Sequence, residues 1–168
     1  LSVKASGTAV SAGTIARIKN STLSVSGHAI KVAGATITGS GELVYKYRIE
    51  ALDAVEFRNS PASFSCKVKH DVGSSINHVI TIRKANSADN FSATTEIGNS
   101  GNISVPTGTD TLISFENLAM GDCANGIEIE IKVSCGAITT KNFEISELQF
   151  NVGEKALPFI TGTIAEEM

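Results

Sequence analysis

Apolar and polar residues alternate through most of the chain from residue 23 onward, in short segments separated by turn-forming residues. Residues two apart in a strand point to the same side, so this alternation predicts strands with one face in a core. Ile127–Val133 is the strongest example, and we expect its Glu128 and Glu130 to lie on a solvated face. Glu42–Glu50 is the next, and its predicted inward face carries Leu43, Tyr45, Tyr47 and Ile49.

About nine or ten short strands are predicted in this way. Ala33–Gly41 is rich in Gly, Thr and Ser and predicts a turn region with at most a short extended piece, and Lys84–Ser92 predicts a polar loop. The remaining strand candidates, bounded by Gly, Pro, Asn and Ser, are Leu23–Ser26, Ala29–Val32, Ser63–His70, His78–Ile82, Ser92–Ile97, Asn102–Val105, Thr111–Leu118, Asn142–Val152 and Leu157–Ile160.

Two segments depart from regular alternation. Ala51–Arg58 predicts one or two helical turns, which end before Pro61 because the residue preceding a proline disfavours the helical region. In Asn142–Val152 the apolar phase slips by one residue, which predicts a β-bulge at Ser146 and Glu147.

These elements predict an all-β fold, an antiparallel two-sheet sandwich of the jelly-roll type with at most one short helix. Helices do not alternate with strands, which excludes a parallel α/β fold. The length of 168 residues suits one domain. We expect residues 1–22 to form a linker or edge strand, 23–160 the jelly-roll domain and 161–168 a C-terminal tail.

Charge and hydropathy exclude two classes of partner. The net charge of −3 gives no electrostatic attraction for nucleic acid. No run approaches the roughly 18 apolar residues that membrane insertion requires. The first residues also lack the basic and apolar regions of a signal peptide.

The three cysteines, Cys66, Cys123 and Cys135, are an odd number, so they cannot all pair within the chain. We interpret them as free thiols in a protein that is assembled in a reducing cytosol, with a single Cys66–Cys135 bridge as the alternative. Their spacing, with that of the three histidines, does not predict a zinc site. We expect no cofactor and no metal ligand, and calcium bound by loop oxygens stays open.

Five blocks of sequence occur in the order known from one family of domains. They are YKYRIEALDAVEF (Tyr45–Phe57), FSCKVKHDVG (Phe64–Gly73), NSADNFS with ISVPTGTDTLISFENL (Asn86–Ser92, Ile103–Leu118), CANGIEIEIKV (Cys123–Val133) and NFEISELQFNVGEKALPF (Asn142–Phe159). Together they resemble the carbohydrate-binding-module-like jelly-roll domain near the C-terminus of bacteriophage tail fibres and tailspikes. The last block, with Gln149, Gly153 and Pro158, is the most similar. This chain lacks the Trp that the family often carries in the strand of Phe64.

This resemblance implies a module of the phage virion tail, assembled in the host cytoplasm, that is often a homotrimer and binds host cell-surface polysaccharide. Composition agrees with the trimer, because only 18% of residues are charged, against roughly 25% in an average globular protein. Uncharged polar and small surface residues can be buried between subunits without the desolvation cost of a charge.

Candidate carbohydrate-binding residues are Arg83, Asp89 and Asn90, in or beside the predicted loop Lys84–Ser92. Their side chains could hydrogen-bond to sugar hydroxyls, and the alternative is an ordinary turn capped by an Asp or Asn side chain. The aromatic residues Tyr45 and Tyr47 lie on a predicted inward face, which favours a core or interface role over a sugar-stacking platform.

Catalytic patterns are absent from the sequence. There is no nucleophile elbow of the GxSxG type, and adjacent strand residues such as His70 and Asp71 point apart. A glycosidase pair could be assembled only from the scattered carboxylates Glu42, Glu50, Asp53, Glu128 and Glu130. We therefore expect no catalytic residues and a non-catalytic virion domain that supports trimer assembly and host-surface glycan attachment. The alternatives are a polysaccharide depolymerase or esterase fragment and a purely structural virion decoration module.

Overall fold

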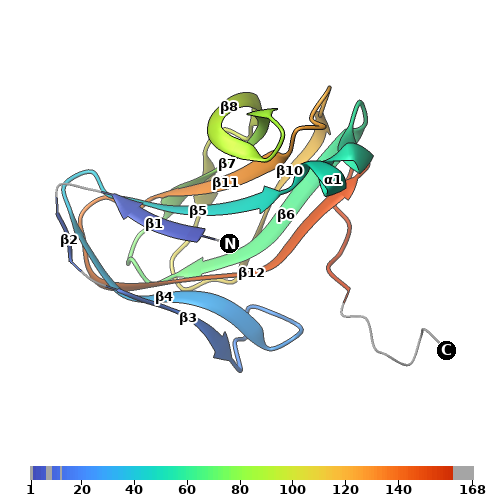
Figure 1. Ribbon diagram of the computed structural model, residues 1–168. Helices are drawn as coiled ribbons and strands as arrows, with labels where there is room; N and C mark the ends of the chain where they lie inside the picture. The colour runs from blue at the N-terminus through green and yellow to red at the C-terminus, as the bar shows by residue number, and fades with distance from the viewer. Residues whose placement is uncertain (1, 7–8, 12, 161–168) are drawn as a thin grey trace.

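The computed structural model describes residues 2–6, 9–11 and 13–160, which form two antiparallel sheets packed face to face (Figure 1). One sheet has the strand order β1-β5-β11-β7-β8, with β9 paired to β7. The other has the order β10-β6-β12-β4-β2, with β3 paired to β4. The predicted all-β sandwich is therefore confirmed.

Each sheet has six strands. The first sheet consists of β1 (Ser2–Ser6), β5 (Glu42–Ile49), β7 (Ile76–Ser87), β8 (Asn90–Asn99), β9 (Ile103–Val105) and β11 (Ile127–Ser134). The second consists of β2 (Ala9–Ser11), β3 (Thr14–Lys19), β4 (His28–Thr38), β6 (Pro61–His70), β10 (Thr111–Ala119) and β12 (Ile138–Val152). In the described residues the only helical segment is α1 (Ala51–Ala54) continued by the 3-10 turn η1 (Val55–Phe57), as the sequence predicts.

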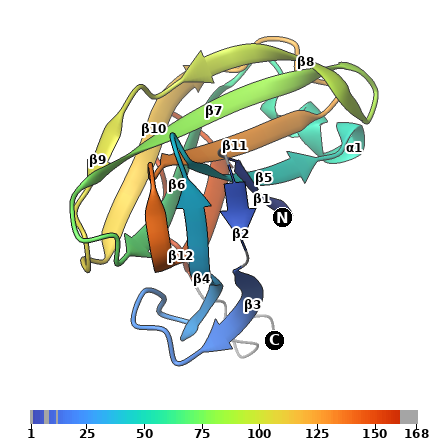
Figure 2. The same cartoon turned by 90° about the vertical axis from the view of Figure 1, so that its left-hand side faces the viewer.

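The core lies between the two sheets, where the inward faces of the alternating strands meet. Strand β11 occupies the middle of the first sheet, between β5 and β7, and β12 occupies the middle of the second, between β6 and β4 (Figure 2). The side chains of Ile129, Ile131 and Val133 on β11 are at most 1% exposed. Phe64, Cys66 and Val68 on β6 face them and are at most 2% exposed. The alternation in the sequence therefore identified the core faces of these strands.

Two predicted segments differ from the structure at the start of the domain. Leu23–Ser26 is a turn and not a strand, with hydrogen bonds from Ser21 N–H to Gly27 O and from Gly27 N–H to Ser24 O. Leu23, one of the apolar residues that predicted a strand there, is fully buried within this turn. The predicted turn region Ala33–Gly41 is mostly strand, because β4 runs as far as Thr38. Ala35 and Ile37 are buried on its inward face, at 4% and 1% exposed.

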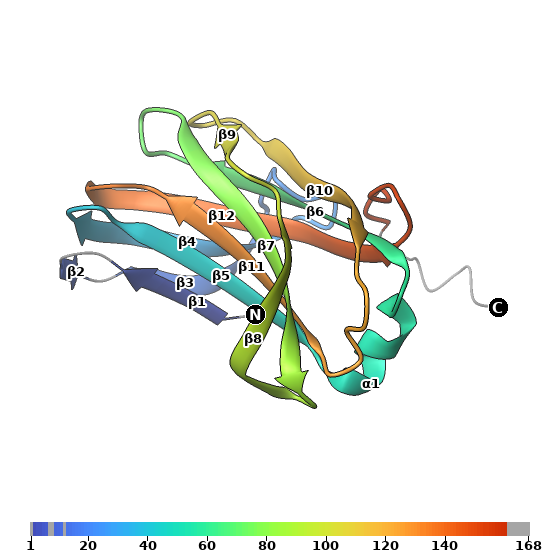
Figure 3. The same cartoon turned by 90° about the horizontal axis from the view of Figure 1, so that it is seen from above.

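The same kind of error occurs in two later segments. The predicted loop Lys84–Ser92 is the tip of a hairpin, because β7 continues to Ser87 and β8 begins at Asn90. Polar residues tolerate a strand here because β8 is the edge strand of its sheet, and β7 pairs with β11 only as far as Lys84 (Figure 3). Leu157–Ile160 is not a strand, and Leu157 and Ile160 are exposed.

The N-terminal residues form edge strands. Strand β1 pairs with β5, and β2 and β3 pair with β4. The predicted C-terminal tail, 161–168, lies outside the described residues. Among the described residues no helix has the length and apolar character needed to span a membrane.

All three cysteines are buried and unpaired, so the alternative Cys66–Cys135 bridge does not form. Cys66 is fully buried in the core, and this burial raises the pKa of its thiol far above the ordinary value. The thiols pack as small apolar side chains.

Candidate functional site

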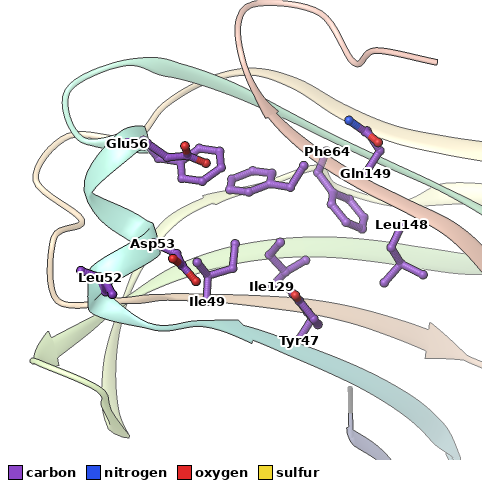
Figure 4. A pocket seen from close by; sticks show the side chains of 11 residues that line it. Tyr47, Ile49, Leu52, Asp53, Glu56, Phe64, Ile129, Leu148 and Gln149 are labelled. Atoms are coloured by element: carbon purple, nitrogen blue, oxygen red, sulfur yellow. The ribbon is translucent and has the colours of Figure 1, made fainter. Parts of the chain in front are cut away.

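A pocket of about 600 Å³ lies between the two sheets at the α1 end of the sandwich, and we call it the open-end pocket (Figure 4). It lies where the second sheet becomes narrower. Among the described residues, β4 pairs with β12 as far as Ile145, and beyond this residue β12 pairs with β6 alone. Residues of β5, β12 and the helical segment line the opening there. The lining residues are Tyr47, Ile49, Leu52, Asp53, Glu56, Phe57, Phe64, Ile129, Leu148, Gln149 and Phe150.

The floor of the pocket is a cluster of three phenylalanines. The rings of Phe57 and Phe150 are stacked, with centroids 4.5 Å apart and an interplanar angle of 20°. The ring of Phe64 is tilted against Phe150, with centroids 6.4 Å apart. Phe57 and Phe64 are buried, so these contacts fasten the helical segment to β12 and β6 and make the pocket rigid.

A β-bulge in β12 turns its residues toward this floor. The register of β12 against β6 shifts between Ser146 and Gln149, and Glu147 has a φ of 51°. The carboxylate of Glu147 points to the outer face, where it pairs with Lys67 at 3.0 Å and accepts the N–H of Val25 at 2.7 Å. The phase of the strand is thereby reset, so that Leu148 and Phe150 line the pocket. The predicted bulge at Ser146 and Glu147 is confirmed.

The rim of the pocket combines an aromatic ring with polar groups. Tyr47 is 45% exposed, whereas Tyr45, two residues earlier on the same face, is 2% exposed. Asp53 and Glu56 supply carboxylates from the helical segment, and Gln149 supplies an amide from β12. An aromatic face with hydroxyl, carboxylate and amide groups beside it can pack against C–H groups and exchange hydrogen bonds with hydroxyl groups.

The outer face of the first sheet carries an ion-pair network instead of a pocket wall. Glu128 is 2% exposed and accepts hydrogen bonds at 2.9 Å from Lys46 Nζ and from Arg48 Nε. Burial opposes ionisation of Glu128, but these two cations hold the pKa of its carboxyl below the ordinary value. The expectation that Glu128 is solvated is wrong, because the long side chains of Lys46 and Arg48 cover it.

The three candidate residues from the sequence do not line the open-end pocket. Arg83 lies in β7, with its Nη1 atom 3.2 Å from Glu130 Oε1. Asp89 is at the tip of the β7–β8 hairpin with a φ of 57°, and its Oδ1 accepts the N–H of Ala51 at 2.6 Å. Asn90 Oδ1 accepts hydrogen bonds from the N–H and the hydroxyl of Ser92. Asp89 thus holds the start of α1, and Asn90 forms the local turn that the sequence offered as the alternative.

Reasoning from sequence also missed the residues that the fold brings together in the pocket. Tyr47 was interpreted as a core or interface residue, and Gln149 was part of the resemblance only. The available signal was that Tyr47 lies near the end of its alternating strand, just before the helical segment. Whether the end of a strand is covered depends on the segments packed against it, and the alternation does not show which segments these are.

Two buried histidines face each other at the other end of the sandwich. His70 and His78 are each 2% exposed, with ring centroids 6.1 Å apart, and His70 Nε2 lies 3.1 Å from Val105 O. Burial lowers the pKa of both, in His78 to about 4, where the neighbouring His70 lowers it further. Among the described residues no three His, Cys, Asp or Glu side chains are grouped as a metal site would require.

Comparison with solved structures identifies the architecture as that of a carbohydrate-binding-module-like β-sandwich. One similar solved structure is described under the promiscuous specificity of carbohydrate-binding modules from the β-sandwich superfamily. It has a TM-score of 0.62 and 13% identity to this chain. It covers 89% of this chain and 56% of the other. A xylan-binding domain of family CBM 22 has a TM-score of 0.59 and 13% identity, with 92% of this chain and 89% of the other covered.

A phage protein is also among the similar structures. The enzymatically active domain of tailspike protein 4 from bacteriophage CBA120 has a TM-score of 0.55 and 11% identity, over 90% of this chain and 19% of the other. This chain therefore spans about half of the first neighbour and about a fifth of the tailspike. No protein-family model and no curated protein sequence matches this chain. At these identities the likeness concerns the fold.

Proposed function

We propose that this chain is a non-catalytic domain of a bacteriophage tail fibre or tailspike that attaches the virion to a host-surface glycan through the open-end pocket. The observation that carries the proposal is the half-exposed Tyr47 at the mouth of a pocket of about 600 Å³ that also presents Asp53, Glu56 and Gln149. The ordered resemblance of five sequence blocks supports the phage assignment. Most of the similar structures are described as carbohydrate-binding modules, which supports a glycan as the ligand.

The chemistry of the pocket suits a sugar. One face of a pyranose ring is largely C–H and packs against an aromatic ring, here that of Tyr47. The hydroxyl groups at the ring edge need acceptors and donors, which Asp53, Glu56 and Gln149 provide. The stacked floor of Phe57 and Phe150 keeps the pocket formed without a ligand, so little conformational entropy is lost on binding.

The alternative of a depolymerase or esterase is less well supported by the pocket. A glycosidase needs one carboxyl group in an apolar environment, so that it stays protonated and acts as a general acid. Asp53 and Glu56 are both solvent-exposed. We expect the purified chain to leave capsular polysaccharide and lipopolysaccharide intact, and release of new reducing ends would overturn the non-catalytic assignment.

A glycan array probed with the purified chain, followed by titration calorimetry, tests the attachment function. We expect Tyr47→Ala to weaken binding at least tenfold with little change in melting temperature. Val25→Ala is the control, because Val25 is 67% exposed in the turn before β4 and does not line the pocket. If the chain binds neither arrayed glycans nor host cells, attachment is wrong and the structural decoration module is the better reading.

The proposal includes a homotrimer, in keeping with a fibre tip. Large apolar side chains are exposed on several strands and near the C-terminal end, among them Ile15 at 56%, Leu112 at 64% and Ile160 at 76%. Contacts between subunits would remove such side chains from water. Light scattering at micromolar concentration should report three times 17.5 kDa, and a monomer at every concentration would contradict the trimer.

A further inference from the structure

We infer that the open-end pocket accepts uncharged glycan segments and discriminates against glycans that carry carboxylate or phosphate groups, through the negative charges of Asp53 and Glu56. This inference rests on the proposed glycan-binding function and specifies the class of ligand. The geometry behind it is the composition of the pocket wall, in which both charged residues are acidic and Lys and Arg are absent.

The two carboxylates are held at one side of the pocket mouth. They are three residues apart on a single helical segment, so they lie on neighbouring positions of the same helical face (Figure 4). Contacts at its first and last residues hold this helical segment in place. Asp89 Oδ1 accepts the N–H of Ala51 at 2.6 Å, and Phe57 stacks on Phe150. The backbone positions that carry the two carboxylates are therefore fixed beside the pocket mouth.

The cations nearest in sequence are engaged elsewhere. Lys46 and Arg48 flank Tyr47 on β5 but point to the opposite face of the sheet, where they pair with Glu128. Arg58, directly after the helical segment, pairs with Asp122 at 3.0 Å. In the part of the chain that the structure describes, no ion pair involves Asp53 or Glu56. Their charge is thus uncompensated at the site where a ligand enters.

This arrangement treats hydroxyl groups and anions differently. A carboxylate accepts hydrogen bonds from neighbouring hydroxyl groups, and such charge-assisted bonds are stronger than neutral ones. A carboxylate or phosphate on the ligand would be repelled by both side chains. The apolar floor of Phe57, Phe64 and Phe150 lowers the local dielectric, so the repulsion is felt more strongly than on an open surface. Because the mouth is solvent-exposed, salt should weaken it.

The test uses probes that differ in charge and little else. Soluble glucan, galactan and mannan are each compared with the same polymer after oxidation of its C6 hydroxymethyl groups to carboxylates. Binding to the purified chain is measured at low and at high salt, for the wild type, for the double variant D53N/E56Q and for the single variants D53N and E56Q. The control variant is E96Q, which removes one exposed carboxylate on β8, outside the pocket.

The expected result is that at least one parent polymer binds and that oxidation weakens its binding at least tenfold at low salt, with a smaller difference at high salt. D53N/E56Q should bring the oxidised polymer to within about threefold of the parent, whereas E96Q should keep the discrimination. Equal binding of parent and oxidised polymers, or discrimination that survives in D53N/E56Q, overturns the charge selection and leaves glycan binding intact. Failure of every polymer, parent and oxidised, together with failure to bind any arrayed glycan or host cell, overturns the proposed function itself.

Discussion

The two ends of the sandwich are built from the same strands but differ in what covers them. At the end that holds His70 and His78, which we call the histidine end, inward side chains are sealed by the loop after β9. There Gly108 N–H donates to His70 O at 2.7 Å, and Gly73 N–H donates to Thr107 Oγ1 at 3.0 Å. At the α1 end, β4 no longer pairs with β12, and the inward face of β5 opens into the pocket.

The contrast is sharpest between two tyrosines on one face of one strand. Tyr45 is enclosed, and its hydroxyl has no hydrogen-bond partner among the described residues. Tyr47 stands half exposed at the pocket mouth. Burial raises the pKa of the Tyr45 phenol far above its ordinary value, with the nearby thiols of Cys66 and Cys135 adding to the shift. The same residue type thus stabilises the core at position 45 and can contact a ligand at position 47.

We expect the largest change in stability when each of the two tyrosines is replaced by alanine in turn. Tyr45→Ala should lower the free energy of unfolding by about 3–5 kcal/mol, because it leaves a large cavity in the core. Tyr47→Ala should lower it by less than about 1 kcal/mol, because much of the ring is already in water. Urea unfolding of both variants measures the difference. Similar losses for the two would show that the α1 end is as closely packed as the middle of the core.

Tyr45→Phe sharpens this test, because it removes only the hydroxyl. A buried polar group without a partner costs free energy, so the variant should be as stable as the wild type or slightly more stable. A clear loss of stability would mean that the hydroxyl does find a partner in solution.

The next effect concerns acid sensitivity of the histidine end. Burial favours neutral His78 in the folded protein, with its pKa near 4, whereas the unfolded chain takes up the proton near its ordinary pKa of 6.5. The contribution of neutral His78 to the free energy of unfolding is fully present above pH 6.5 and is lost as the pH falls toward 4. The pKa difference corresponds to about 3 kcal/mol at most.

Urea midpoints at pH 7 and at pH 4.5 measure this loss, and His78→Leu should remove most of it while glycan binding at neutral pH is kept. Asp71, next to His70 in sequence, moderates the effect because it raises the pKa of His70. An unchanged pH slope in His78→Leu would place the acid sensitivity elsewhere, most simply in the carboxylates.

A smaller effect separates the two kinds of carboxylate. Glu128→Gln should cost about 1–2 kcal/mol, because it removes the charge that Lys46 and Arg48 both contact, and the loss should shrink in 1 M salt. Glu56→Gln should change stability by less than about 0.5 kcal/mol, because Glu56 is exposed and contributes no ion pair. Denaturation at two salt concentrations tests both, and equal losses would contradict the distinction.

The sequence predicted a large part of this structure for a simple reason. Alternation with a period of two is a local property, so the inward faces of β5, β6 and β11 followed from it, as did the helical segment before Pro61. The bulge at Ser146 and Glu147 was visible as a slip of the apolar phase. Where neighbours of low hydrophobicity form a strand, as in the second half of β4, or where a buried residue such as Leu23 anchors a turn, the local signal misled.

The candidate site could not be predicted from local patterns in the same way. Arg83, Asp89 and Asn90 have the right chemistry for sugar, but hydrogen bonds and ion pairs occupy them in local structure. Glu128 occupies a polar position in the alternating pattern of its strand. It is nevertheless buried, because Lys46 and Arg48 cover it from the neighbouring strand. For Arg83, Asp89 and Glu128 the deciding partner is far away in sequence, whereas the partner of Asn90 is Ser92, two residues later.

The sequence by itself determined which residues face inward along each strand, because side-chain direction depends only on the backbone of that strand. Tertiary structure decided which inward faces are covered. That outcome depends on the pairing of β4 with β12, which ends at Ile145, and on the place of the helical segment. Tyr47 is half exposed beside that segment, whereas Tyr45 is enclosed. Tertiary structure also placed Asp53 and Glu56 beside the pocket, through the packing of Phe57 on Phe150. Strand pairing between distant segments is a property of the whole chain, and it created the pocket.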